Sequence, residues 1–331
     1  MGRRSRGDRL MHGATAFLAA APAVVVLGLA GFLLAAALPA IRYMGWSFFS
    51  GTTWSLGNLY AQHAVVVHGV HVEPGAQFGA CVFIVGTAVT AFLALVFATP
   101  PAVAAAAASA LTLPPRWRRP AAAMVETLAG IPSVVYGLVG LMTLGPFVFG
   151  SLGPWLDRWL SPLPFISGAV NTPTNLLTAV LVLTVMILPI IAATVRAFME
   201  RIPSGLLEAG RALGWTDWEI FRLIVLPYAA PAVLGGMLLG LGRALGETMA
   251  VLMVSGNALN VLPSNWYSAV GTLAATIAGQ LDAAFQDPTG MAVSALGLLG
   301  LLLMAMTLAT NLLARVLVNR WGVRASAGVA R

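Results

Sequence analysis

Charge is the scarcest property of this sequence. The 331-residue chain contains no lysine, and charged residues make up only 9% of it, whereas soluble domains are about a quarter charged. Residues of the set AVILMFWYC account for 59%. A water-soluble fold would have to hide that apolar surface with almost no polar coat, so the composition indicates an integral membrane protein.

The absence of lysine also excludes one way of using ATP. A P-loop holds nucleotide phosphates with a Gly-Lys-Ser or Gly-Lys-Thr sequence, and this chain has neither. If ATP drives the protein, a separate subunit must bind it with magnesium and hydrolyse it. We therefore expect a non-catalytic subunit without a cofactor of its own.

Cysteine is nearly absent as well. Cys81 stands alone, which excludes an intrachain disulfide, and its apolar neighbours predict a small buried hydrophobic residue. One segment gathers three histidines and a glutamate: His63, His68, His71 and Glu73. Because VVVHGVHV alternates like a strand and lacks a zinc-ligand spacing, we expect an exposed hairpin and no metal site.

Long apolar runs are what the sequence does contain. A transmembrane helix needs about 20 mostly apolar residues. Six segments meet this requirement: 14–40, 78–111, 121–150, 174–199, 229–255 and 291–317. Pro100 and Pro101 are expected to kink or end the second helix. The expected fold class is therefore an all-α integral membrane protein with six transmembrane helices.

The arginines indicate how these helices are oriented. Fifteen of the 18 lie in the terminal segments or after the second and fourth helices, and only Arg42 and Arg158 lie in the loops on the other side. Positive residues concentrate in cytoplasmic loops, so both termini are expected on the cytoplasmic side of a bacterial plasma membrane. The position of the arginines at the ends of apolar segments also argues against a nucleic-acid partner, which the net charge of +7 would otherwise suggest. The expected segments are a cytoplasmic N-terminal segment (1–13), a first helix with its outer loop (14–77), a core of transmembrane helices (78–317) and a cytoplasmic tail (318–331).

The two long outer loops are rich in aromatic residues. Loops 43–77 and 256–290 carry Trp46, Trp54 and the pair Trp266 and Tyr267. Tryptophan and tyrosine favour the boundary between membrane and water. Interfacial anchoring and contact with a partner protein outside the membrane are both compatible with this pattern.

The longest inner connection, 200–228, has the marks of a structured segment. A helix is expected over 204–213, capped by its first residue, a serine, and stopped by Gly214. Thr216 and Glu219 then form the S/T-x-x-E pattern of a capping box, which opens a second helix. A pair of amphipathic helices at the membrane surface is the simpler alternative.

Two ionisable residues lie within the fifth apolar segment. Arg243 and Glu247 are four residues apart, which puts them on one face of a continuous helix. Charges within the membrane usually face a cavity or pathway, and the planar guanidinium of arginine matches tetrahedral oxyanions. The alternative is a structural ion pair, but buried ion pairs stabilise poorly compared with apolar side chains. We therefore interpret both residues as part of a substrate pathway.

Two polar residues of the third apolar segment are weaker candidates. Glu126 is expected at the cytoplasmic edge, where the positive end of the helix dipole favours a carboxylate. Pro132 is expected to bend the helix, which would allow Ser133 to face a pathway. A plain structural kink explains the same residues.

The inner connection resembles a known motif. Glu208-Ala209-Gly210, then Gly214, then Ile224-Val225-Leu226-Pro227 match the EAA loop of ABC importer permeases, in which E-A-A precedes a glycine and I-x-L-P at fixed distances. Gly210 stands where that family often has alanine. The resemblance implies a coupling helix that docks on a cytoplasmic ATPase, with Glu208, Ala209 and Gly214 in the docking element. Pro227 is expected to interrupt the second helix near the membrane.

Further motifs make the resemblance more specific. GLGRALGETMAVLMVSGN, AGIPSVVYGLVGL, FGACVFIVGTAVTA and NLLARVLVNR are similar to segments of the C-type permease subunits of bacterial phosphate importers. That family implies a type I importer fold and phosphate translocation involving Arg243 and Glu247. It also implies three kinds of partner: a second, A-type permease subunit, two ATPase subunits and an extracytoplasmic binding protein. The segment 61–75 looks longer than the corresponding family loop.

Other functions fit parts of the sequence. An ABC permease for sulfate, molybdate or a phosphonate would also use a cationic pathway, because arginine does not discriminate among tetrahedral oxyanions. A secondary transporter acting alone would not need a structured inner connection. A membrane enzyme is less well supported, because neither H-E-x-x-H nor G-x-S-x-G occurs.

Overall fold

The computed structural model describes residues 6–329 except 62, 161, 163 and 164. In this part of the chain, six helices are long and apolar enough to cross a membrane, as the sequence predicts. The first, second, fourth and sixth agree with the expected segments to within four residues, whereas the third and fifth do not. The six cover Phe17–Met44, Cys81–Thr112, Ser133–Leu160, Leu176–Met199, Asp217–Leu245 and Met291–Leu313.

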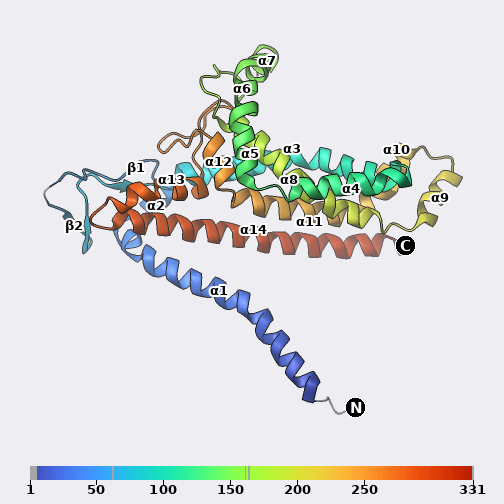
Figure 1. Ribbon diagram of the computed structural model, residues 1–331, viewed down its shortest axis with the longest axis horizontal. Coiled ribbons are helices and arrows are strands. Elements are labelled where there is room, and N and C mark those ends of the chain that lie inside the picture. Colours follow the sequence, from blue (N-terminus) through green and yellow to red (C-terminus); the bar gives the residue numbers. More distant parts are fainter. Residues whose placement is uncertain (1–5, 62, 161, 163–164, 330–331) are drawn as a thin grey trace.

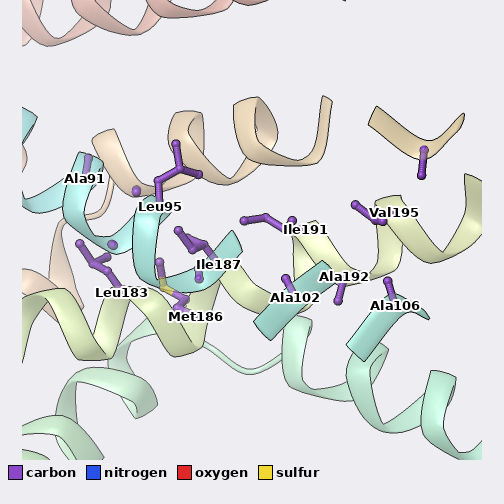
Figure 2. Packing of buried hydrophobic residues seen from close by; sticks show 14 of the residues in the cluster. Ala91, Leu95, Ala102, Ala106, Leu183, Met186, Ile187, Ile191, Ala192 and Val195 are labelled. Carbon is purple, nitrogen blue, oxygen red and sulfur yellow. The ribbon is translucent and has the colours of Figure 1, made fainter. Parts of the chain in front are cut away.

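Helix α8 (Leu176–Met199), capped by Asn175, lies at the centre of the bundle. It packs along α3 (Cys81–Ala107), α11 (Leu226–Leu245) and α4 (Pro115–Ala129). Small residues let helices approach closely in a membrane, and α3 turns alanines toward larger side chains of α8 (Figure 2). Residues in this contact include Ala91, Leu95, Ala102 and Ala106 of α3, and Leu183, Met186, Ile187, Ile191 and Val195 of α8.

Two long helices lie outside this centre. Helix α14 (Met291–Val329) packs against α11, α13 (Leu273–Phe285) and α1 (Arg6–Met44). The N-terminal half of α1 runs away from the bundle (Figure 1), and its apolar part is almost wholly exposed. Both expected terminal segments are therefore helical as far as the structure describes them. Their outermost parts, residues 1–5 and 330–331, lie outside the described residues.

The third apolar segment is not one continuous helix over 121–150, and that expectation is wrong. Helix α4 ends at Ala129, and α5 (Ser133–Val139) begins after a break. Pro132 restricts the residue before it to extended conformations, so the chain cannot remain helical through the break. The spanning segment continues to Leu160 through α6 (Gly145–Phe147), α7 (Gly153–Leu160) and two π-helical stretches, η2 (Gly140–Leu144) and η3 (Val148–Leu152). It runs across the direction of α3, α8 and α14 (Figure 1).

The fifth segment begins and ends about ten residues earlier than expected. It consists of α10 (Asp217–Ile220), the π-helical stretch η4 (Phe221–Val225) and α11, which ends at Leu245. A short helix, α12 (Met249–Val254), follows the break. Arg243 and Glu247 therefore do not share one continuous helix.

Three prolines that were expected to kink, end or interrupt a helix lie in segments that remain helical. Helix α3 continues beyond Pro100 and Pro101 to Ala107, and the π-helical stretch η1 (Ala108–Thr112) extends it. Pro227 lies in the first turn of α11, directly after η4. The Leu226 N–H donates to the Phe221 carbonyl five residues back, so a wider turn accommodates the proline that cannot donate a bond of its own.

The first of the expected outer loops contains two small antiparallel sheets and a short helix, α2 (Ser47–Ser50). Strand β1 (Trp54–Ser55) pairs with β4 (Gln77–Phe78), and β2 (Val65–Val67) pairs with β3 (Val70–Val72). The β2–β3 pair confirms the hairpin expected in 61–75. In the described part of the chain, no three or more His, Cys, Asp and Glu residues come together as a possible metal site.

The aromatic residues of these loops differ in their surroundings. Trp46 is 87% exposed, which fits an interfacial position, whereas Trp54 and Tyr267 are buried. Trp54 packs edge-on against Phe78 and Phe83. The Tyr267 hydroxyl donates to the Gly153 carbonyl at 3.1 Å, and burial raises its pKa, to which the nearby charge of Asp157 adds. Tyr267 and Trp54 therefore fasten the outer loops to the bundle and do not contact lipid.

Candidate functional site

Arg243 lies in the last turn of α11, and its side chain is exposed on the isolated chain. The two residues that follow it, Ala244 and Leu245, belong to an apolar cluster against which Tyr136 of α5 packs. Among the residues that the structure describes, no carboxylate forms an ion pair with Arg243. An unpaired guanidinium at a helix end, on a face that the chain itself does not cover, is free to attract an anion.

Glu247 lies in the break after α11 and points into the bundle. Its side chain is only 9% exposed, and its Oε1 accepts a hydrogen bond from the Ala250 N–H at 3.2 Å. A carboxylate in this position caps the first turn of α12, and the positive end of the helix dipole favours its negative charge. The expectation that Glu247 meets Arg243 on one helix face is therefore wrong for this conformation, because the helix ends between them.

Three threonines form a small polar pocket around Glu247. The Thr87 hydroxyl donates to the Phe83 carbonyl at 2.7 Å and accepts from the Leu273 N–H at 2.9 Å. Thr272 caps α13 by accepting from the Ala275 N–H. The bond between Thr87 and Leu273 joins two walls of the pocket, α3 and the start of α13, and residues of α8, α11 and α12 complete its lining. The threonines are Thr87, Thr90 and Thr272.

The glycines near Arg243 have different roles. A Cβ on Gly240 would lie 3.2 Å from Ile191 of α8, so Gly240 permits close packing. Gly246 terminates α11, and its added Cβ would meet only a backbone oxygen, at 3.8 Å. Gly240 is thus a packing position, and Gly246 marks the end of the helix.

Tyr136 is the pathway candidate that sequence reasoning missed. Its hydroxyl donates to the Leu128 carbonyl of α4 at 2.7 Å, across the break that contains Pro132. Ser133, the weaker predicted site residue, is the first residue of α5 and is partly buried. Tyr136 lies one turn further along α5, and that helical spacing from Ser133 was the available signal.

The inner connection folds as a compact helical pair. Helix α9 (Ser204–Ala212) is followed by α10, and Thr216 and Glu219 form the expected capping box. Ser204 does not cap α9, because Pro203 occupies the cap position without a side-chain bond. Gly214 has φ +79°, the left-handed conformation that a helix stop requires. The pair is therefore shaped by its own hydrogen bonds.

The docking residues implied by the EAA resemblance are accessible. Glu208, Ala209 and Gly214 are exposed. The intervening Gly210 is buried, and a Cβ there would approach Ile220 and Trp215 at 3.1 and 3.3 Å. Glycine in place of the family's alanine thus lets α9 pack closely on α10. A cavity of about 1010 Å³ lies between this helical pair and the ends of α3 and α8.

An ion-paired cluster connects α4 with the end of α8. Arg196 of α8 contacts Glu126 of α4 at 2.8 Å and Glu200, at the C-cap of α8, at 3.4 Å. The Arg196 side chain is 18% exposed, against 62% for Glu126 and 49% for Glu200. Glu126 lies outside the spanning helix Ser133–Leu160, so its position is that of an edge residue.

The family model for inner membrane components of binding-protein-dependent transport systems matches residues 101–323. The chain belongs to this family. Its membership and its six apolar helices identify a multi-pass inner-membrane permease subunit.

Relatives with assigned names agree with this membership. Phosphate transport system permease protein PstC 1 of Mycobacterium tuberculosis is 44% identical over 86% of this chain and 85% of its own length. The PstC proteins of Pasteurella multocida and Xylella fastidiosa are 39% and 38% identical, over 87% and 96% of this chain and 87% and 94% of theirs.

A solved structure supports the fold. A chain of a bacterial alginate ABC transporter, crystallised with its periplasmic protein bound to an alginate pentasaccharide, aligns with a TM-score of 0.53. The match covers 95% of this chain and 99% of that one at 14% sequence identity. It indicates an ABC importer permease architecture, as the sequence predicts.

Proposed function

We propose that this chain is the C-type permease subunit of an importer that carries inorganic phosphate across the membrane. The names of the relatives support phosphate as the substrate. The observation that carries the proposal is Arg243, an exposed guanidinium with no ion-pair partner among the described residues, at the end of a transmembrane helix. A buried or paired arginine would not attract a passing oxyanion.

The chain works in this proposal with three other subunits and a delivering protein. A second, A-type permease subunit pairs with it to complete the path. Two cytoplasmic ATPase subunits bind ATP and magnesium, and one of them contacts the exposed residues Glu208, Ala209 and Gly214. An extracytoplasmic binding protein delivers phosphate on the opposite side. Both termini and α9 lie in the cytoplasm, in agreement with the arginine distribution.

Within the path, the two charged residues act differently. Arg243 supplies positive potential for hydrogen phosphate, a dianion that a planar guanidinium can bind through two hydrogen bonds. Glu247 does not hold the arginine in this conformation. It caps α12 and thereby fixes the break that leaves Arg243 at a helix end. Glu247 is therefore a positioning residue here, and Arg243 contacts the anion.

The test replaces Arg243 by glutamine in the complete complex. The permease pair, ATPase and binding protein are reconstituted in liposomes, and labelled phosphate uptake and ATP hydrolysis are measured together. Arg243→Gln should abolish uptake while the complex still assembles and hydrolyses ATP. Arg158→Gln is the matched control, because Arg158 is also an exposed arginine in the last turn of a helix, α7, and it should retain uptake.

Two outcomes would contradict the proposal. Full phosphate uptake by Arg243→Gln would remove the role of the guanidinium. Uptake of sulfate, molybdate or a phosphonate by the unmodified complex, without phosphate uptake, would keep the ABC permease class and replace the substrate.

A further inference from the structure

Helix α4 makes two connections to other helices, both close to its C-terminal end. Near its C-terminus, Glu126 forms an ion pair with Arg196 of α8 at 2.8 Å. Two residues further on, the Leu128 carbonyl accepts from the Tyr136 hydroxyl of α5 at 2.7 Å. One connection therefore leads to α8 and the other leads to α5.

The first connection lies close to the inner helical pair. Arg196 is in the last turn of α8, and α9 begins at Ser204, after a turn that includes Glu200. The Arg196 side chain is only 18% exposed, and its Nε is buried without a hydrogen-bond partner among the described residues. Solvent screens such a pair less than a fully exposed one. Movement of α9 is thus transferred to α8 and, through Arg196, to α4.

The second connection leads to the end of α11. Tyr136 packs against two apolar clusters, one of which includes Ala244 and Leu245, the residues that follow Arg243, and the other Ala250 and Val254 of α12. Because α12 follows the Glu247 break and packs along α5, a shift of α5 changes the surroundings of both charged residues. The Tyr136 bond bridges the three-residue break that separates α4 from α5.

We propose that α4 transmits movement of the coupling helix α9 to the anion-binding Arg243, and that Arg196 and Tyr136 are the positioning residues that fasten its connections. This inference rests on the proposed function, because the experiment that tests it measures phosphate transport. The chemistry is an electrostatic contact at one end of the route and a neutral hydrogen bond at the other. Each is made between elements that backbone hydrogen bonds do not join.

The structure offers a matched pair of substitutions. Glu126 and Glu200 both contact Arg196, but only Glu126 lies on another helix. Glu126→Gln removes the charge that ties α4 to α8, whereas Glu200→Gln removes a contact within one helix end. Both variants lose one exposed carboxylate next to the same arginine, so a general effect of charge would appear equally in both.

The measurement is the number of phosphate ions taken up per ATP hydrolysed in liposomes that contain the full complex. Coupling between sites typically changes an equilibrium about 5- to 150-fold, so Glu126→Gln should lower this ratio by about fivefold or more. Glu200→Gln should stay within about twofold of the unmodified complex. An unstable variant would lose uptake and hydrolysis together and leave the ratio unchanged.

A second variant tests whether both connections belong to one route. Tyr136→Phe keeps the ring and removes the hydroxyl that reaches Leu128, and it should lower the ratio as Glu126→Gln does. The double variant should be no worse than the more affected single variant, because substitutions on one route are not additive. Equal ratios for Glu126→Gln and Glu200→Gln would overturn the proposal, and so would multiplicative losses in the double variant.

A distance measurement separates this proposal from the proposed function. In a Cys81→Ser background, spin labels at Met124 of α4 and Leu312 of α14, both exposed, report movement of α4 when ATP is added. The distance should change in the unmodified sequence and in Glu200→Gln, and should stay constant in Glu126→Gln. If the complex moves no phosphate but shows this pattern, the substrate proposal fails and the transmission route stands. An ATP-driven change that persists in Glu126→Gln refutes the route itself.

Discussion

Replacement of Gly86 by alanine should disrupt the contact that holds the polar pocket together. An alanine Cβ on this residue of α3 would lie 2.0 Å from the Gly271 carbonyl oxygen and 2.8 Å from Cγ2 of Val270. Close carbon–oxygen contacts in proteins are about 3.3–3.6 Å. The backbone segments must therefore separate by roughly 1.3 Å to reach that range.

The cost follows from what this separation breaks. Insertion of one carbon into a packed interior costs about 1–3 kcal/mol, and a value near the top of this range is expected because the nearest atom belongs to the backbone. The hydroxyl of the next residue, Thr87, accepts a hydrogen bond from the Leu273 N–H. Loss of that bond adds about 1 kcal/mol to the loss of stability. We expect a total near 3–4 kcal/mol.

The matched control is Gly235→Ala in α11, where an added Cβ meets nothing within 4 Å. It should be neutral or stabilising, because alanine favours a helix over glycine by about 1 kcal/mol. Thermal unfolding in detergent, followed by circular dichroism, should place Gly86→Ala on the order of 5–10 °C below the unmodified protein. Phosphate uptake should fall as well, because Thr87 and Thr272 move relative to Glu247. Equal melting temperatures for the two variants would refute the reasoning.

Two further predictions concern the helix end and the inner helical pair. Glu247→Gln retains an oxygen that can accept the Ala250 N–H, whereas Glu247→Ala does not, so the alanine variant should be less stable by about 1 kcal/mol; equal stabilities in thermal unfolding would contradict the capping role. Gly214→Ala has space for its Cβ but must adopt φ +79°, which costs about 1–2 kcal/mol, so it should weaken copurification of the ATPase. Gly205→Ala, at a position with open space and no unusual φ, is its control and should copurify normally.

Composition and apolar run length were enough to predict the fold class. The number of apolar segments, the hairpin in 61–75 and the capping box of Thr216 and Glu219 all follow from local rules and are confirmed. The cap at Ser204 was wrong, because any of several adjacent residues can begin a helix and the identity of one residue does not decide among them.

The errors at the site arise from helix continuity. Placing Arg243 and Glu247 on one face assumed an unbroken helix, and the sequence GETM contains no proline that would have indicated the break. The end of α11 depends on packing of Glu247 against α3 and α13, which lie far from it in the sequence. The same limitation hid Tyr136, whose partner Leu128 is reached only across a bend.

The π-helical stretch η4 (Phe221–Val225) has a consequence for the direction in which Arg243 points. Each residue of an α-helix advances by about 100° around the axis, and a π-helical turn contains one residue more than an α-helical one. Deletion of a single residue from η4 would remove its wide turn and would rotate all later side chains by roughly that angle relative to α10. The direction in which the guanidinium of Arg243 points, relative to α10, is therefore set by one extra residue that lies several turns before Arg243.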